Sequence, residues 1–238
     1  MDWIFGLEGD DFDLDELSKV FTNPDLCIEK VDNNGYELKS SHFHLLTSMD
    51  MAQKRAEELL ISINAGIKLE LGAHNPIKIK TGVQIDEKGE ERKFIFLNCP
   101  FHVRDTLTIH TITCDGKKSV SNPAEPIISI NTIAQLDAQV KMVCQYIGQD
   151  FDSWGNLYKI FEVIESDGFP PIQRDGQYKK MSDRFRRTAN SFSASGLDSR
   201  HSKDTIPPPK NPMSITDAKI FIKTIFHEWL VTKQNKIT

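Results

Sequence analysis

Hydrophobic positions recur every second residue in the first half of the chain and every third or fourth residue in the second half. A period of two is typical of strands with one buried face, and a period near 3.6 is typical of amphipathic helices. The change falls at the turn-forming segment 119–126, SVSNPAEP. The pattern therefore predicts an α+β protein, with a mixed α+β domain over residues 1–122 and a helical domain over residues 126–238.

The first domain is predicted to hold about six strands and one long helix. Apolar residues at helical spacing follow Ser48, a good N-cap, and Gly66 is a suitable C-terminal stop, which predicts a helix over 48–65. The predicted strands are an edge strand at 3–7, a hairpin over 26–39 that continues through His42 and His44, and the runs 67–71, 77–85, 92–97 and 103–114.

The second domain contains four amphipathic patterns joined by short connections. They predict helices over residues 133–148, 153–164, 178–192 and 214–229. Four such helices with short joints indicate a four-helix bundle.

Composition excludes some classes of protein but does not indicate an activity. The chain is 39% hydrophobic and 26% charged, as in a globular protein, and its net charge of −5 argues against a protein that coats nucleic acid. We find no signal peptide and no run of about 18 apolar residues, and the cysteines form no C-x-x-C unit. These features predict a cytoplasmic location and no membrane association.

Few motifs suggest chemistry. Phosphate-binding glycine loops, H-E-x-x-H units and Glu-x-x-His pairs are all missing from the sequence, so no cofactor is predicted. His42 and His44 would share one face of a strand and could bind a metal with Cys27 or His110. We favour a polar strand face instead, because no ligand set of known spacing is complete, and predict no metal site.

The most cationic segment lies between the last two predicted helices. Residues 179–210 contain eight basic and three acidic side chains, a net charge of +5. Its candidate anion-binding or RNA-binding residues are Arg186, Arg187, Asn190, Arg200 and His201.

Two interpretations of this segment stay open. In the first, arginine forks bind phosphate and His201 exchanges protons near neutral pH, which makes Arg200 and His201 the candidate catalytic residues. In the second, the segment is structural: Arg186 and Arg187 interact with the carbonyls at the end of their helix, and Arg200 binds Glu162 or Glu165.

The second half also shows a resemblance. The order W-x-x-L-Y-K-I-x-E-x-I (154–164), A-N (189–190), R-H (200–201) and P-P-x-N-P-M (208–213) resembles a pattern in uncharacterised bacterial proteins, which implies no activity. The helical half is also loosely similar to HEPN domains, helical bundles of bacterial toxins and anti-phage systems. Many of those cleave RNA with Arg-x4–6-His, whereas Arg200 and His201 are adjacent here.

Two hypotheses follow for the function. The favoured one is a cytoplasmic bacterial binding or interaction protein without catalytic activity, an accessory component of a larger defence or mobile-element system. It predicts a protein partner or a homo-oligomer. The alternative is a HEPN-like RNA-binding module or metal-independent ribonuclease that uses the loop carrying Arg200 and His201.

Overall fold

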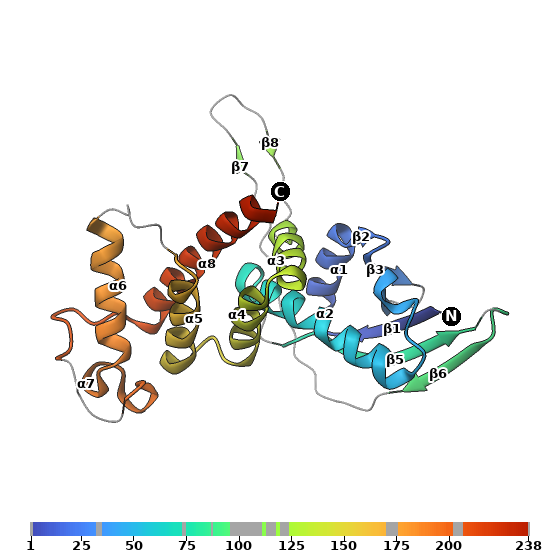
Figure 1. The fold of residues 1–238 in the computed structure, drawn as a ribbon, viewed down its shortest axis with the longest axis horizontal. Coiled ribbons are helices and arrows are strands. Elements are labelled where there is room, and N and C mark those ends of the chain that lie inside the picture. The colour runs from blue at the N-terminus through green and yellow to red at the C-terminus, as the bar shows by residue number, and fades with distance from the viewer. Residues whose placement is uncertain are drawn as a thin grey trace. The chain divides into compact units, whose positions relative to one another are not determined.

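The chain forms two compact units, Met1–Thr132 and Ile133–Thr238, which are described separately. The computed structural model describes residues 2–31, 35–72, 75–86, 88–95, 111–112, 118–119, 124–169, 176–201 and 207–237. A six-stranded sheet in the first unit and helices throughout the second confirm the predicted α+β class (Figure 1). The two units divide inside helix α3 (Glu125–Leu136), after the segment 119–126 that the sequence suggested as a boundary.

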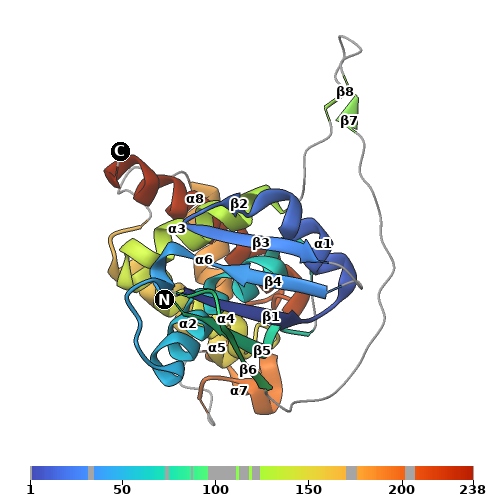
Figure 2. The same cartoon turned by 90° about the vertical axis from the view of Figure 1, so that its right-hand side faces the viewer.

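The first unit is built on an antiparallel sheet. Its strands are β1 (Asp2–Glu8), β2 (Thr22–Asn23), β3 (Leu26–Val31), β4 (Gly35–Lys39), β5 (Lys78–Ile85) and β6 (Glu91–Ile95). They lie in the order β2-β3-β4-β1-β5-β6, and Figure 2 shows the longer ones side by side. The predicted hairpin 26–39 is confirmed as the pair β3–β4.

Strand β1 lies in the middle of this sheet, between β4 and β5, so the prediction of an edge strand was wrong. Trp3, Phe5 and Leu7 alternate toward the core. Gly6 faces the other way, where an added Cβ would lie 2.2 Å from Oγ1 of Thr81 on β5. A side chain at this position would therefore require the Thr81 side chain to move.

Helix α2 (Met49–Glu70) supplies most of the helical side of this core. It continues past Gly66 through the residues predicted as a strand at 67–71, so both the helix end and that strand were wrong. An added Cβ on Gly66 would lie 2.6 Å from Ile127 of α3. Gly66 is thus a contact point between two helices, where a side chain would not fit, and it does not end the helix.

The hairpin does not extend through His42 and His44. Residues Ser41–Phe43 form the 3-10 turn η1 after β4, and Phe43 is fully buried. The His44 imidazole contacts the Asp2 carboxylate instead of sharing a strand face with His42. The strand continuation was therefore wrong, because burial of Phe43 turns the chain away from the sheet.

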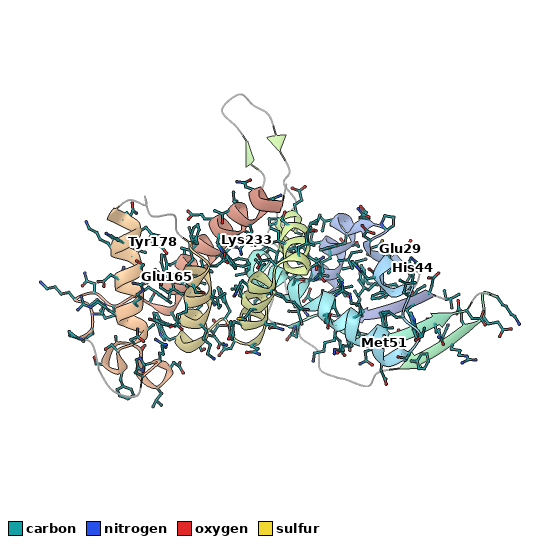
Figure 3. All side chains as sticks on the ribbon, viewed as in Figure 1. Glu29, His44, Met51, Glu165, Tyr178 and Lys233 are labelled. Carbon is teal, nitrogen blue, oxygen red and sulfur yellow. The ribbon has the colours of Figure 1, made fainter. Side chains whose placement is uncertain are left out.

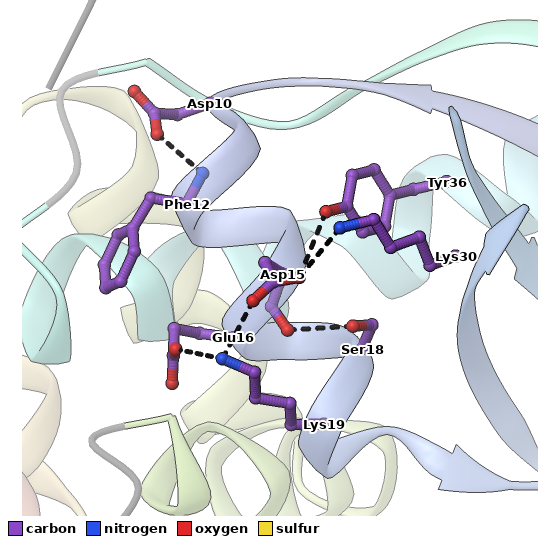
Figure 4. Close-up of polar contacts among 8 residues, drawn as sticks. All are labelled: Asp10, Phe12, Asp15, Glu16, Ser18, Lys19, Lys30 and Tyr36. Carbon is purple, nitrogen blue, oxygen red and sulfur yellow. Dashed lines mark hydrogen bonds and ion pairs between the residues drawn. The ribbon is translucent and has the colours of Figure 1, made fainter. Parts of the chain in front are cut away.

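Helix α1 (Asp11–Val20) carries a surface ionic network (Figure 4). Asp15 lies 2.8 Å from Lys19 on the same helix and 3.1 Å from Lys30 on β3. Hydrogen bonds from these two ammonium groups lower the pKa of Asp15 below its ordinary value. Lys19 and Lys30 are exposed and Asp15 is partly exposed, so water screens the network and it contributes little net stability.

The predicted strand 103–114 lies almost wholly outside the described residues. Of that range, only Thr111–Ile112 is described, as the short strand β7, which pairs with β8 (Lys118–Ser119).

The second unit is helical. Its longer helices are α4 (Ala138–Gln149), α5 (Trp154–Ser166), α6 (Gly176–Ala189) and α8 (Ile215–Ile237), with the short α7 (Phe192–Ser195) and 3-10 turn η2 (Gly196–Asp198) between the last two. Helix α5 contacts α4, α6 and α8. The bundle topology stays a prediction.

The single helix predicted over 133–148 is in fact two helices, α3 and α4. Asp137 separates them, because its carboxylate accepts hydrogen bonds from the backbone N–H groups of Gln139 and Val140 and so caps α4. Periodicity alone conceals this break, because apolar residues continue on both sides of a single polar residue.

Aromatic side chains from α5, α6 and α8 form a cluster in the core of this unit. Phe185 of α6 is fully buried, 5.1 Å from Phe161 of α5 and 5.6 Å from Phe221 of α8, measured between ring centroids. Tyr158 stacks on the same Phe185 ring at 6.1 Å. Phe185 is the residue through which the three helices meet.

Lys233 joins three helices through ionic contacts; Figure 3 labels it. Its ammonium lies 2.7 Å from a carboxylate oxygen of Asp137, the cap of α4, and 2.7 Å from one of Asp167, which follows α5. Trp229 donates a hydrogen bond of 2.8 Å to Asp167 as well. Only 9% of the Lys233 side chain is exposed, so this Lys233 clamp is shielded from solvent.

Across the described part of the chain, no helix combines the length and apolar character required to span a membrane.

Candidate functional site

The C-terminal end of α6 holds three of the residues that the sequence singled out. Arg186 pairs with the Glu165 carboxylate on α5 and lies over the Phe161 ring, 5.1 Å from its centroid. The hydrogen bond that Arg186 donates to the Glu165 carboxylate raises the pKa of Arg186 above its ordinary value. Arg186 is therefore engaged by an acid of its own chain.

Arg200 returns to the same region from the far end of η2. Its backbone N–H donates to the Ala189 carbonyl at 2.9 Å. Its guanidinium lies 3.1 Å from Glu162 and 4.3 Å from the centre of the Tyr158 ring. The structural interpretation of the segment predicted a contact of this kind between Arg200 and an acid.

Arg184 and Arg187 bind the proline-rich segment that leads into α8. Arg187 donates to the carbonyls of Pro207 and Pro208, at 3.0 and 3.3 Å from its terminal nitrogen. Arg184 donates to the carbonyls of Asn211 and Pro212, at 2.6 and 3.1 Å. These arginines hold the proline-rich segment against α6.

Asn190 and His201 differ from the arginines. Asn190 is 5% exposed, and its amide donates to the Arg186 carbonyl at 2.9 Å. Its Oδ1 accepts no hydrogen bond within the described part of the chain. His201 is exposed, and its backbone carbonyl accepts from Ser199. The structure thus brings Arg186, Asn190 and Arg200 to one end of α6, while the Arg187 guanidinium binds the proline-rich segment and His201 lies at the surface.

A groove between α6 and α8 was not anticipated from the sequence. It has a volume of about 650 Å³ and is partly open to solvent. Helix α6 contributes Gln177, Tyr178, Met181 and Arg184 to it. Helix α8 contributes Asp217, Ile220, Phe221, Thr224, Ile225 and Glu228. These residues define the α6–α8 groove.

The groove has an apolar floor and charged walls. Phe221 and Ile225 are buried and form the floor with Tyr178, whereas Ile220 is 60% exposed on one wall. Asp217 and Glu228 lie on the same wall as Ile220, and Arg184 lies on the α6 wall. The sequence feature that could have indicated the groove is Ile220, an apolar residue that falls outside the main apolar stripe of its helix.

The described side chains give little support for a metal site or a reactive cysteine. No group of three His, Cys, Asp or Glu residues is close enough together there to hold a metal ion. Burial raises the pKa of the Cys144 thiol to about 12 and also raises that of Cys27. Thiols with raised pKa values are poor nucleophiles at neutral pH, because the thiolate is the reactive form.

Comparison of the chain with known protein families, with curated proteins and with solved structures finds no match.

Proposed function

We propose that the chain is a binding or interaction protein without catalytic activity, and that the α6–α8 groove is its recognition surface. The groove is the observation that carries this proposal. Binding sites are usually concave and mostly apolar, with a few polar groups that orient what binds. A volume of about 650 Å³, an aromatic and aliphatic floor and charged walls fit that description.

The state of the cationic residues also supports a partner other than a polyanion. Arg186 and Arg200 are paired with Glu165 and Glu162, and Arg187 binds carbonyls of its own chain. A phosphate group would have to compete with these acceptors before it gained a contact. Exposed apolar surface in the groove requires no such exchange.

The test is affinity recovery from the native host with wild type, Ile220→Asp and Leu197→Asp. Leu197 is 94% exposed on η2 and lies outside the groove, so it is a matched control. We expect wild type and Leu197→Asp to retain the same partner or self-association, and Ile220→Asp to lose it. A strictly monomeric protein with no partner would contradict the proposal.

A HEPN-like RNA-binding module or metal-independent ribonuclease is a second proposal. Residues 133–238 carry fifteen basic and twelve acidic side chains, a net charge of +3, and His201 is exposed. The pure protein and His201→Ala would be incubated with total RNA without divalent metal. Cleavage lost in His201→Ala would support the ribonuclease. Absence of cleavage by both proteins would exclude it, and RNA binding unaffected by salt would exclude the RNA-binding form.

A further inference from the structure

The α6–α8 groove follows one stripe of α8. Asp217, Ile220, Thr224 and Glu228 are separated by three, four and four residues, the spacing that places side chains on one helix face. Eleven residues of helix rise by about 16 Å, or three turns. The groove is therefore elongated, with room along it for several side chains in a row.

Both walls of the groove are helices, which restricts what can bind. The backbone N–H and C=O groups inside α6 and α8 are paired within each helix. An extended peptide laid between them would find no ladder of backbone partners and would leave its own polar groups unpaired. A helix satisfies its own backbone groups and presents only side chains to the groove.

The charges of the two walls differ in sign. Helix α8 contributes Asp217 and Glu228, and α6 contributes Arg184. A complementary helix would carry acidic residues on its edge toward α6 and basic residues on its edge toward α8.

We propose that the α6–α8 groove binds one amphipathic helix of a partner protein, through apolar side chains at positions i, i+3 or i+4, and i+7. This inference rests on the proposed binding function and names the class of its partner. The helix is acidic along one edge of its apolar stripe and basic along the other. Its side chains cover Ile220 and the aromatic floor beneath it.

The experiment selects peptides against the full chain. A displayed library of about 16-residue sequences, long enough for more than three helical turns, would be patterned as amphipathic helices and as extended strands. Synthetic winners would be titrated by fluorescence anisotropy into wild type, Ile220→Asp, Thr224→Arg and Leu197→Asp, each checked for helix content by circular dichroism. Thr224→Arg is a second groove variant, at an exposed position of the α8 wall.

We expect helical peptides with the stated spacing to be selected. Their affinity should fall about tenfold or more for both groove variants, and stay unchanged for Leu197→Asp. A central proline in the peptide should abolish binding, because it breaks the helix, and exchange of the acidic and basic edges should weaken binding. Selection of extended peptides, or equal affinity for wild type and the groove variants, would overturn the inference.

A second copy of the chain is the remaining occupant to distinguish. A dimer that becomes monomeric in Ile220→Asp, measured by analytical ultracentrifugation, would overturn the partner-helix inference and leave the interaction function standing. A monomer that recovers from the host nothing dependent on Ile220 would instead contradict the proposed function itself. The two failures therefore give different results.

Discussion

Two regions of α6 differ: its C-terminal end carries charged side chains that are already paired, whereas its groove side lies beside exposed apolar surface. The C-terminal end of the helix is the most charged part of the unit, yet Arg186 is already paired with Glu165, and Arg187 with carbonyls of Pro207 and Pro208. The groove side of the same helix has fewer charges, and its neighbour Ile220 is mostly exposed. Charge density in a sequence therefore does not indicate which surface is free to bind.

The contribution of an ion pair to stability depends on how far solvent screens it. The side chains of Arg186 and Arg200 are partly exposed, so their ion pairs are screened by water, whereas the Lys233 clamp is shielded. We therefore expect substitutions of these residues to reduce the free energy of unfolding most at the Lys233 clamp and less at the cationic end of α6.

The largest effect is expected for Lys233→Met. It leaves Asp137 and Asp167 without their shared counterion in a mostly buried position, and the free energy of unfolding should fall by about 3 kcal/mol in urea denaturation. Lys219→Met is the control, since Lys219 pairs with the exposed Asp152, and it should cost less than about 1 kcal/mol. Equal losses in the two variants would show that burial does not determine how much each ion pair contributes to stability.

The same clamp predicts a pH dependence. Burial favours the neutral forms of Lys233 and Asp137, but their hydrogen-bonded ion pair outweighs it, so the pKa of Lys233 is raised and the pKa of Asp137 is lowered. The stabilisation is fully present between the unfolded values of 3.8 and 10.5. It is lost as pH falls through the lowered pKa of Asp137, or rises through the raised pKa of Lys233.

The measurement is the stability difference between wild type and Lys233→Met against pH. We expect a constant difference between those two values and a smaller difference beyond either of them. A difference that changes most near pH 7 would mean that another group governs the clamp.

A smaller effect is expected for Arg200→Ala. The substitution removes a cation–π contact with Tyr158 and a partly exposed ion pair with Glu162, and should reduce the free energy of unfolding by about 1 kcal/mol. A double-mutant cycle with Glu162→Gln measures the ion-pair share, which should be about 0.5 kcal/mol. No loss of stability in Arg200→Ala would favour a free, ligand-binding arginine.

The smallest effect is expected for His201→Ala. The imidazole is exposed, so the free energy of unfolding should change by less than about 0.5 kcal/mol, measured under the same conditions. A loss above about 1 kcal/mol would show that His201 stabilises the loop.

Much of the fold could be predicted from local pattern. A short apolar run identified the strand that became β1, although not its central place in the sheet, and helical spacing identified α5 and α8, because each helix buries one face. The failures depended on tertiary contacts: Gly66 has the local signature of a helix stop, but it lies inside α2 against Ile127 of α3. A glycine has the same local signature whether it ends a helix or admits a neighbour.

The candidate site was predictable only as a list of residues. In one of the two interpretations, the sequence named Glu162 or Glu165 as the partner of Arg200; the structure pairs Arg200 with Glu162, and Arg186 with Glu165. The groove could not be predicted, because it depends on how far α6 lies from α8. That distance is set by the aromatic rings of Phe185 and Phe221, far apart in sequence.

The central claim is tested most directly by measuring partner binding and unfolding together in Ile220→Asp and Arg200→Ala. The account predicts a crossed result. Ile220→Asp should lose binding by about tenfold or more with a stability change below about 0.5 kcal/mol. Arg200→Ala should lose about 1 kcal/mol of stability and keep its affinity. Loss of binding in Arg200→Ala, with Ile220→Asp binding as wild type does, would contradict the account and move recognition to the cationic end of α6.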